Sequence, residues 1–320
     1  MVRAKQNKKI INYHDDESVS VIIVTKDRER DILLCLKSIS QQTKLPDEIL
    51  IVDSSEKNSL ENKVKKFKYL NLEYIHTEKK GIPVQRNIGI RKTNKDIVFF
   101  CDDDVILTKY FLKELLNVFK QHPGHVGGVT AHWLHKKLSI PKKTLELCVW
   151  LFCTVFFHGR AANGKFRLSG LPDTISDEKH GVRPCEFLYG FAMAFRRKTI
   201  KKFMFDEKLK GYANGEDQDI AYRISRKYQN YYTPFAKIYH NISPSARENL
   251  FPAAERKIKY FNYRFKKNMP QDMKHVLAFW WAALGMLILE TLLGIKHKSL
   301  KGSLGIIRGI LDIILGKEQI

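Results

Sequence analysis

Cysteine pairs and glycine-rich phosphate loops are what this 320-residue sequence lacks. Its five cysteines are odd in number and none lies in a C-x-x-C pattern, which is typical of reduced core residues in a cytosolic compartment. The dinucleotide fingerprint G-x-G-x-x-G and the complete P-loop G-x-x-x-x-G-K-[ST] are missing as well. A bound phosphate would therefore have to be held by a metal ion and by arginine.

Acidic residues are scarce relative to basic ones. The chain has 56 Lys and Arg against 34 Asp and Glu, and its formal net charge of +22 predicts attraction to polyanions. Nucleic acid, anionic lipid head groups and phosphorylated substrates all fit this charge, which does not choose among them. Residues 1–17 contain no apolar run of the kind that a signal peptide needs, and we expect them to form a flexible tail.

Strands and helices alternate along the first third of the chain. Apolar, β-branched runs predict strands at residues 18–25, 49–52, 72–75 and 97–101, and apolar residues at helical spacing predict helices between them. A hydrophobic content of 44% is enough for one large core or two smaller ones. The alternation predicts an α/β fold with a mostly parallel, Rossmann-like sheet flanked by helices.

Three consecutive aspartates, Asp102, Asp103 and Asp104, follow the strand predicted at residues 97–101. Adjacent carboxylates repel one another unless a cation neutralises them, and oxygen ligands at a strand end suit Mg²⁺ or Mn²⁺. The alternative is a solvated acidic turn that caps the helix predicted to begin near Tyr110. Further polar residues are expected at the same edge of the sheet, where open parallel sheets bind ligands. These residues are Thr25, Arg28, Asp53 and Arg86.

A second acidic group opens a helix in the C-terminal half of the chain. Glu216 and Asp217 stand on the first turn of this predicted helix, directly after the glycine-flanked segment 211–215. The alternative is that acids at a helix N-terminus only offset the helix dipole, which is a stronger explanation for one acid than for a pair behind such a loop. A later strand, predicted at residues 231–239, delivers His240.

Six motifs resemble, in their order, those of family 2 glycosyltransferases with the A-type fold, over residues 18–244. They are VSVIIVTKDR, IVDSS, GIPVQRNIGI, FFCDDDV, LYGFAMAFRR and GEDQDIAYR. The resemblance implies a nucleoside-diphosphate sugar donor whose base and ribose lie against Thr25 and Asp53. The chain departs from the pattern at Ser54, where many relatives carry a second acid or an asparagine, so the identity of the base stays open.

The resemblance also implies roles for the remaining candidates. Asp217 is expected to be the catalytic base, supported by Glu216, and Asp102 is expected near the ribose. The residues expected to hold Mg²⁺ or Mn²⁺ are Asp102, Asp104 and His240. The residues expected to complete the donor site are Arg28, Arg86 and Asp103. One base without a carboxylate nucleophile between donor and acceptor implies a single displacement that inverts the anomeric carbon.

These assignments divide the chain into four parts. The tail of residues 1–17 precedes a catalytic domain at residues 18–250. Within this domain, residues 18–107 form the half that binds the nucleotide sugar and residues 108–250 form the acceptor half. Residues 251–320 are expected to form a helical C-terminal region.

The C-terminal region is both basic and apolar. Residues 276–289 are fourteen uncharged residues, too short a run to span a bilayer, and residues 300–314 place apolar side chains on one helical face. This pattern predicts a membrane-associating tail on the cytoplasmic face of an anionic membrane, peripheral or anchored at the interface, with a single span left open. The alternative is that the helices pack on the catalytic domain or on another copy of the chain, as an oligomer.

The leading hypothesis is thus a metal-dependent, inverting glycosyltransferase of the hexosyltransferase class, with a lipid-linked or cell-envelope glycan as acceptor. A sugar nucleotidyltransferase is the second hypothesis, but it would usually carry a glycine-rich loop after the first strand, and TKDRERD contains no glycine. A basic protein that binds nucleic acid is the third. Its lysines would be clustered, whereas here they are dispersed, and no nucleic-acid partner is expected.

Overall fold

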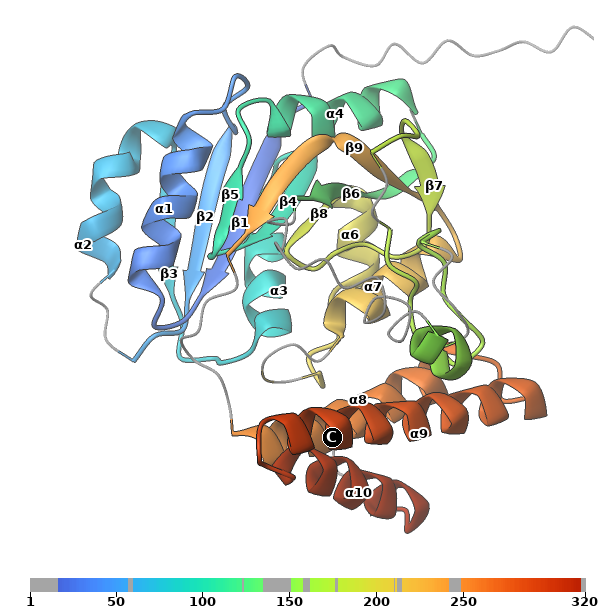
Figure 1. Ribbon diagram of the computed structural model, residues 1–320. Helices are drawn as coiled ribbons and strands as arrows, with labels where there is room; N and C mark the ends of the chain where they lie inside the picture. Colours follow the sequence, from blue (N-terminus) through green and yellow to red (C-terminus); the bar gives the residue numbers. More distant parts are fainter. Residues whose placement is uncertain are drawn as a thin grey trace, which may run out of the picture.

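The computed structural model describes residues 17–56, 60–122, 124–134, 151–157, 162–175, 178–209, 211, 215–241 and 249–317. The predicted tail of residues 1–17 lies outside this set except for Glu17. Figure 1 shows a twisted sheet with helices packed on its faces and, beside this body, a group of three C-terminal helices. The division into a catalytic domain and a helical C-terminal region stays a prediction.

Four parallel strands form the N-terminal half of the sheet, in the order β3-β2-β1-β4. They are β1 (Val19–Thr25), β2 (Glu48–Asp53), β3 (Leu72–His76) and β4 (Ile97–Asp102). The elements between them are α1 (Glu29–Ser40), α2 (Leu60–Val64), the 3₁₀ helix η1 (Lys65–Leu70) and α3 (Ile82–Lys92). β1 is buried along its whole length, and β4 is buried except at Asp102, as expected for strands covered on both faces. The prediction for this half is confirmed.

Beyond β4 the sheet is mixed. β8 (Ala192–Arg196) is antiparallel to both β4 and β6 (Val126–Trp133), and β9 (Gln229–His240) is parallel to β6. Two short strands, β5 (Val105–Leu107) and β7 (Arg183–Cys185), pair antiparallel with β9. Helices of this half include α4 (Phe111–Gln121), α6 (Arg197–Phe203) and α7 (Glu216–Ser225), and residues 151–157 are helical as well. The parallel character predicted from the alternating pattern therefore belongs to the N-terminal half.

The C-terminal region consists of α8 (Leu250–Asn268), α9 (Met273–Lys296) and α10 (Lys301–Ile314), which enclose a second hydrophobic core. Glycines let α10 lie close to α8: a Cβ atom at Gly305 would be 2.3 Å from the carbonyl oxygen of Phe251. This core is built from side chains of all three helices, including Phe261, Phe265, Phe279 and Ile306. The three helices are therefore one packed unit.

Helix α9 is, among the described residues, the helix that is long and apolar enough by length and composition to cross a membrane. About a third of its apolar window, 33%, is buried inside the protein. Phe279 stacks on Phe265 and is 2% exposed, whereas Trp281 is 43% exposed. One side of α9 thus supplies the second core, while Trp281 stacks on Phe156 and donates a hydrogen bond of 2.7 Å to the carbonyl oxygen of Val155.

Candidate active site

The aspartate triplet and His240 meet where β4 and β9 end. Asp102 is the last residue of β4, and Asp104 precedes β5, which pairs Val105 with His240 on β9. His240 Nε2 lies 3.0 Å from Asp104 Oδ1, and ligand atoms of Asp102, Asp104 and His240 all lie within 4.8 Å of one another. The structure therefore brings together the three residues that the sequence predicts as metal ligands.

The acidic-turn alternative does not match the start of α4. This helix begins after Tyr110 and has no side-chain hydrogen bond at its N-cap. Asp103 and Asp104 are instead buried, at 3% and 4% exposure. The triplet is thus part of the sheet edge and caps no helix there.

Thr25, the last residue of β1, and Arg28, which follows β1, bind the triplet. Thr25 Oγ1 donates a hydrogen bond of 2.6 Å to Asp103 Oδ2. Arg28 Nη1 lies 3.1 Å from Asp103 Oδ1 and 3.3 Å from Asp104 Oδ2. Burial raises the pKa of Asp103 to about 7, although the bonds from Thr25 and Arg28 oppose this shift. Burial also raises the pKa of Asp102 against the opposing charge of Arg86.

Arg86 joins the triplet to the acidic pair. Its side chain is 2% exposed; Nη2 donates to Asp102 Oδ1 at 3.2 Å and Nη1 donates to Glu216 Oε1 at 3.2 Å. Nη2 also donates to the carbonyl oxygen of Gly190 at 2.9 Å. Because a guanidinium is planar and carries several fixed donors, one side chain can hold β4, α7 and the loop before β8 in a single arrangement.

Asp217 faces the same edge from the first turn of α7. Asp217 Oδ2 accepts a hydrogen bond of 3.2 Å from Gly190 N, and Oδ1 accepts one of 2.8 Å from Gln218 N. A Cβ atom at Gly190 would lie 3.0 Å from Asp217 Oδ2, so the glycine permits this close approach. Burial, and then the charge of Glu216, raise the pKa of Asp217 to about 6. Glu216 is engaged by Arg86, whereas Asp217 is held mainly by backbone N–H groups.

The apolar run at residues 185–195, with Gly190 inside it, predicts a single strand from the sequence, and the structure differs there. β7 ends at Cys185 and β8 starts at Ala192, so Gly190 lies in the loop between them. The apolar side chains Phe187 and Leu188 are buried without belonging to a strand. Burial alone produced the strand-like pattern, because a buried loop and a buried strand are both apolar.

Asp53 lies at the end of β2 and is fully buried, at 0% exposure. Its Oδ1 accepts hydrogen bonds from Ser55 N at 2.8 Å and Ser55 Oγ at 2.5 Å, and its Oδ2 accepts one from Tyr74 at 2.7 Å. Burial and this bond raise the pKa of the Tyr74 hydroxyl above its usual range. Asp53 thus orders the loop after β2, where a nucleotide base is expected.

Three polar residues near the site were missed in the sequence. Gln85 donates to the carbonyl oxygens of Thr25 and Val52 at 2.9 and 2.8 Å, and so ties α3 to the ends of β1 and β2. The other two, Asp219 and Arg264, connect α7 with α8. Gln85 and Asp219 stand inside motifs that could have pointed to them. Arg264 lies outside every motif.

The mixed sheet, the aspartate triplet after β4 and the acidic pair on α7 together define the A-type glycosyltransferase fold. The sequence model of the family described as glycosyl transferase family 2 matches residues 20–202. This match covers more than half of the 320-residue chain. The chain belongs to glycosyl transferase family 2.

Curated relatives with glycosyltransferase names match shorter stretches. An uncharacterized glycosyltransferase, YwdF, from Bacillus subtilis (strain 168) is 32% identical over 128 residues, which cover 38% of this chain and 42% of that protein. An uncharacterized glycosyltransferase from Haemophilus influenzae is 28% identical over 106 residues, covering 33% of this chain and 35% of that protein. The chain therefore spans less than half the length of these relatives.

Solved structures resemble the fold over most of the chain. The mannosyltransferase PcManGT from Pyrobaculum calidifontis, solved with GDP-Man and Mn²⁺, is 15% identical with a TM-score of 0.57, and the match covers 94% of this chain and 88% of that chain. GalNAc-T7, solved with UDP, GalNAc and Mn²⁺, is 13% identical with a TM-score of 0.61, covering 95% of this chain and 58% of that chain. At these identities the likeness shows the fold.

Replacing Arg86 tests whether it neutralises the buried carboxylates. Arg86→Met leaves Glu216 and Asp102 without their cation, and we expect it to lower the free energy of unfolding by about 3–5 kcal/mol. The control is Arg91→Met on the same helix, whose side chain is 56% exposed and lies 3.8 Å from Glu207. That change should cost at most about 1 kcal/mol, since exposed pairs contribute little. Urea unfolding measures both, and equal losses would contradict the role of Arg86.

Proposed function

We propose that this glycosyltransferase transfers a hexosyl group from a nucleoside-diphosphate sugar to a hydroxyl of a lipid-linked or cell-envelope glycan, with inversion. The observation that carries the proposal is the meeting of two groups at one edge of the sheet. One group is the cluster of Asp102, Asp104 and His240, the other is the acidic pair on α7, and Arg86 lies between them. The nucleotide sugars and Mn²⁺ named with the solved structures support a donor and metal of these kinds.

Asp102, Asp104 and His240 would hold Mg²⁺ or Mn²⁺. Two carboxylates and an imidazole at mutual distances within 4.8 Å form a donor set suited to such ions. Burial raises the pKa of Asp102 and of Asp103 although Arg86 and Arg28 lie beside them, and a bound cation would offset this cost of burial. A bound ion would supply positive charge to the diphosphate leaving group.

The donor site would be completed by side chains at the carboxyl ends of β1 and β2 and by Arg28 after β1. Thr25 and Arg28 fix the orientation of Asp103 and thereby the shape of the triplet. Asp53 acts on the donor through the loop that it orders, because its own carboxylate is fully buried. The identity of the base stays open in this proposal.

Asp217 would take the proton of the acceptor hydroxyl. A carboxylate whose pKa is raised to about 6 is still ionised at neutral pH and is a stronger base than an ordinary aspartate. The N–H group of Gly190 fixes Asp217 Oδ2, and the bond from Arg86 keeps Glu216 beside it. A single base on the acceptor side leads to direct displacement, and hence to inversion.

Family membership favours this proposal over the two rival hypotheses. A sugar nucleotidyltransferase would belong to a different family, and the match over residues 20–202 favours an enzyme over a nucleic-acid-binding protein. The excess of basic residues is instead assigned to anionic substrate and membrane.

The three-helix region would hold the enzyme on the cytoplasmic face of a membrane. Exposed apolar side chains recur at helical spacing on α9, at Leu277, Trp281, Leu284, Leu292 and Ile295. They recur likewise on α10, at Leu300, Leu304, Ile307, Leu311 and Ile314. Exposed cations flank these stripes, at Lys274, Lys296, Lys298 and Lys301. Each basic residue near an anionic leaflet contributes about 1 kcal/mol to binding, and the apolar stripes add to it.

Asp217→Asn tests the proposed function directly. The amide keeps the shape but accepts no proton, so we expect kcat for transfer to fall by about 10²-fold or more while donor affinity stays near that of the wild type. The wild-type rate should rise with pH through about 6, as Asp217 loses its proton. The rate of nucleoside diphosphate release measures both the fall in kcat of the variant and the pH dependence of the wild type.

Asp31→Asn, which removes an acid from the first turn of α1, is the control for a simple effect on a helix dipole. It should leave kcat unchanged. If Asp217→Asn instead abolishes donor binding, Asp217 belongs to the donor site and is not the base.

Sedimentation with vesicles tests the membrane proposal. The full chain should sediment with vesicles of phosphatidylglycerol, and high salt should weaken the binding only in part, since apolar insertion persists when charges are screened. Leu304→Glu with Ile307→Glu places charges on the exposed face of α10 and should release the protein. Leu34→Glu, at a leucine of α1 that is 46% exposed, is the control. If the wild-type chain instead stays in the supernatant at low salt, the membrane proposal is wrong. The exposed apolar faces of α9 and α10 would then be contacts between copies of the chain.

A further inference from the structure

Arg264 of α8 lies against the turn that presents Asp217, although it belongs to the C-terminal helical region. A Cβ atom at Gly215 would lie 2.4 Å from Arg264 Cζ and 2.5 Å from Nη1, so the guanidinium fills the space that a side chain at Gly215 would need. Gly215 is the N-cap of α7 and has a φ of +78°, a conformation that favours glycine. The backbone directly before Glu216 and Asp217 is therefore fitted to this arginine.

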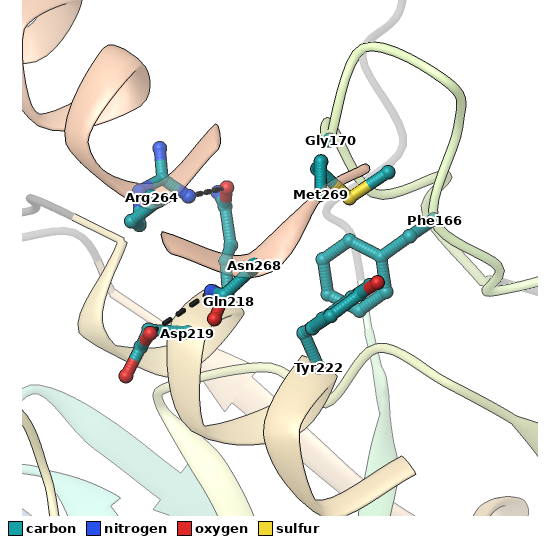
Figure 2. A pocket seen from close by; sticks show the side chains of 8 residues that line it. All are labelled: Phe166, Gly170, Gln218, Asp219, Tyr222, Arg264, Asn268 and Met269. Atoms are coloured by element: carbon teal, nitrogen blue, oxygen red, sulfur yellow. Dashed lines mark hydrogen bonds between the residues drawn. The ribbon is translucent and has the colours of Figure 1, made fainter. Parts of the chain in front are cut away.

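The polar contacts of Arg264 reach the same turn. Its Nη1 donates to Gln218 Oε1, the residue after Asp217, and its Nε donates to the carbonyl oxygen of Tyr260 within α8 at 3.3 Å. Figure 2 shows Arg264 pointing from its helix toward Gln218. With an exposure of 9%, Arg264 is a buried cation. Such a group is costly unless nearby negative charge compensates it.

The compensating negative charge comes from the acidic residues at the start of α7. Arg264 faces the charges of Asp217, Glu216 and Asp219, while burial lowers its own pKa. The other charged groups that act on Asp217 are Glu216 of its own helix and Arg86 of α3, and Asp217 in turn acts on Asp102 of β4. Arg86 of α3 and Arg264 of α8 are thus both buried cations that act on the first turn of α7.

The docking of α7 on α8 has separate contacts. Asp219, at 0% exposure, accepts a hydrogen bond of 2.9 Å from Asn268 Nδ2 and pairs with Lys267 at 2.9 Å. Figure 2 shows the bond from Asn268 to Asp219 one turn away from Arg264. Arg264 is therefore not the sole link between the two helices, and its position is specific to the turn that carries Asp217.

We propose that Arg264 is a positioning residue for Asp217, which makes the C-terminal helical region part of the active site. It fixes the first turn of α7 so that the carboxylate meets the acceptor hydroxyl, and its charge keeps that carboxylate ionised. The inference rests on the proposed role of Asp217 as the base. It also links the helices that carry the exposed apolar stripes to the chemical step.

The test compares Arg264→Gln and Arg264→Lys in the full chain, with Mn²⁺ and a nucleoside-diphosphate sugar from which the wild type releases nucleoside diphosphate. Arg264→Gln should lower kcat about tenfold or more, because a misplaced base loses its alignment, while the donor KM changes little. The acidic limb of its pH–rate profile should move to higher pH, since one of the two cations near Asp217 is lost. Arg264→Lys keeps the positive charge, so the acidic limb of its pH–rate profile should lie closer to that of the wild type.

Asn268→Ala is the matched control, because it removes a contact between α7 and α8 without altering the charge near Asp217. It should lower Tm but leave kcat and the acidic limb unchanged. If Arg264→Gln does not fold, Arg264→Lys carries the test through its kcat, which should fall because a lysine cannot reproduce the contact to Gln218.

Three outcomes would overturn the inference. Wild-type kcat and pH profile in both Arg264 variants would show that Arg264 does not position the base, and the role of Asp217 would stand. Equal losses of Tm and kcat in Arg264→Gln and Asn268→Ala, with an unmoved limb, would make Arg264 a docking residue. Wild-type kcat in Asp217→Asn would remove the proposed base and this inference with it.

Discussion

Negative charge buried at one edge of the sheet is the constraint on which the rest of the site depends. The triplet after β4 and the acidic pair on α7 are largely withdrawn from water, which raises the pKa of Asp102, Asp103 and Asp217. Such a cluster is stable only if cations are placed among its members with good geometry. Arg86 meets this need by contacting both groups at once. The uncompensated remainder of the charge is what a divalent ion would neutralise.

The change from parallel to mixed pairing serves the same edge. The parallel strands β1, β2 and β4 end there and supply Thr25, Asp53 and the triplet, as in other open sheets. The strand β9 brings His240 to Asp104, and the loop before β8 brings Gly190 to Asp217. Helix α8 contacts α7 through Arg264 and Asn268. Residues far apart in sequence thus reach one site through the order of the strands.

Much of this arrangement could be predicted from the sequence, and the rest could not for physical reasons. The parallel strands β1, β2 and β4 are buried on both faces and so appear as apolar runs, and the triplet follows β4 without a spacer. The segment around Gly190 was predicted as a strand because buried loops are as apolar as buried strands. Arg264 could not be found, since its partner Gly215 is distant in the chain and an arginine in a basic helix carries no signal of burial. Likewise, the apolar run at residues 276–289 does not reveal that Phe279 faces a core whereas Leu277 is 62% exposed.

The proposed donor site depends most on a metal ion that joins the aspartate triplet to a nucleotide. Calorimetric titration of nucleoside diphosphates into the full chain, with Mn²⁺ and with EDTA, measures this directly for the wild type and for Asp104→Ala. Binding of at least one nucleoside diphosphate to the wild type with Mn²⁺, lost in EDTA and lost in a folded Asp104→Ala protein, is the predicted result. Equal affinity in EDTA, or wild-type affinity in Asp104→Ala, would contradict the assignment of the cluster as the metal site.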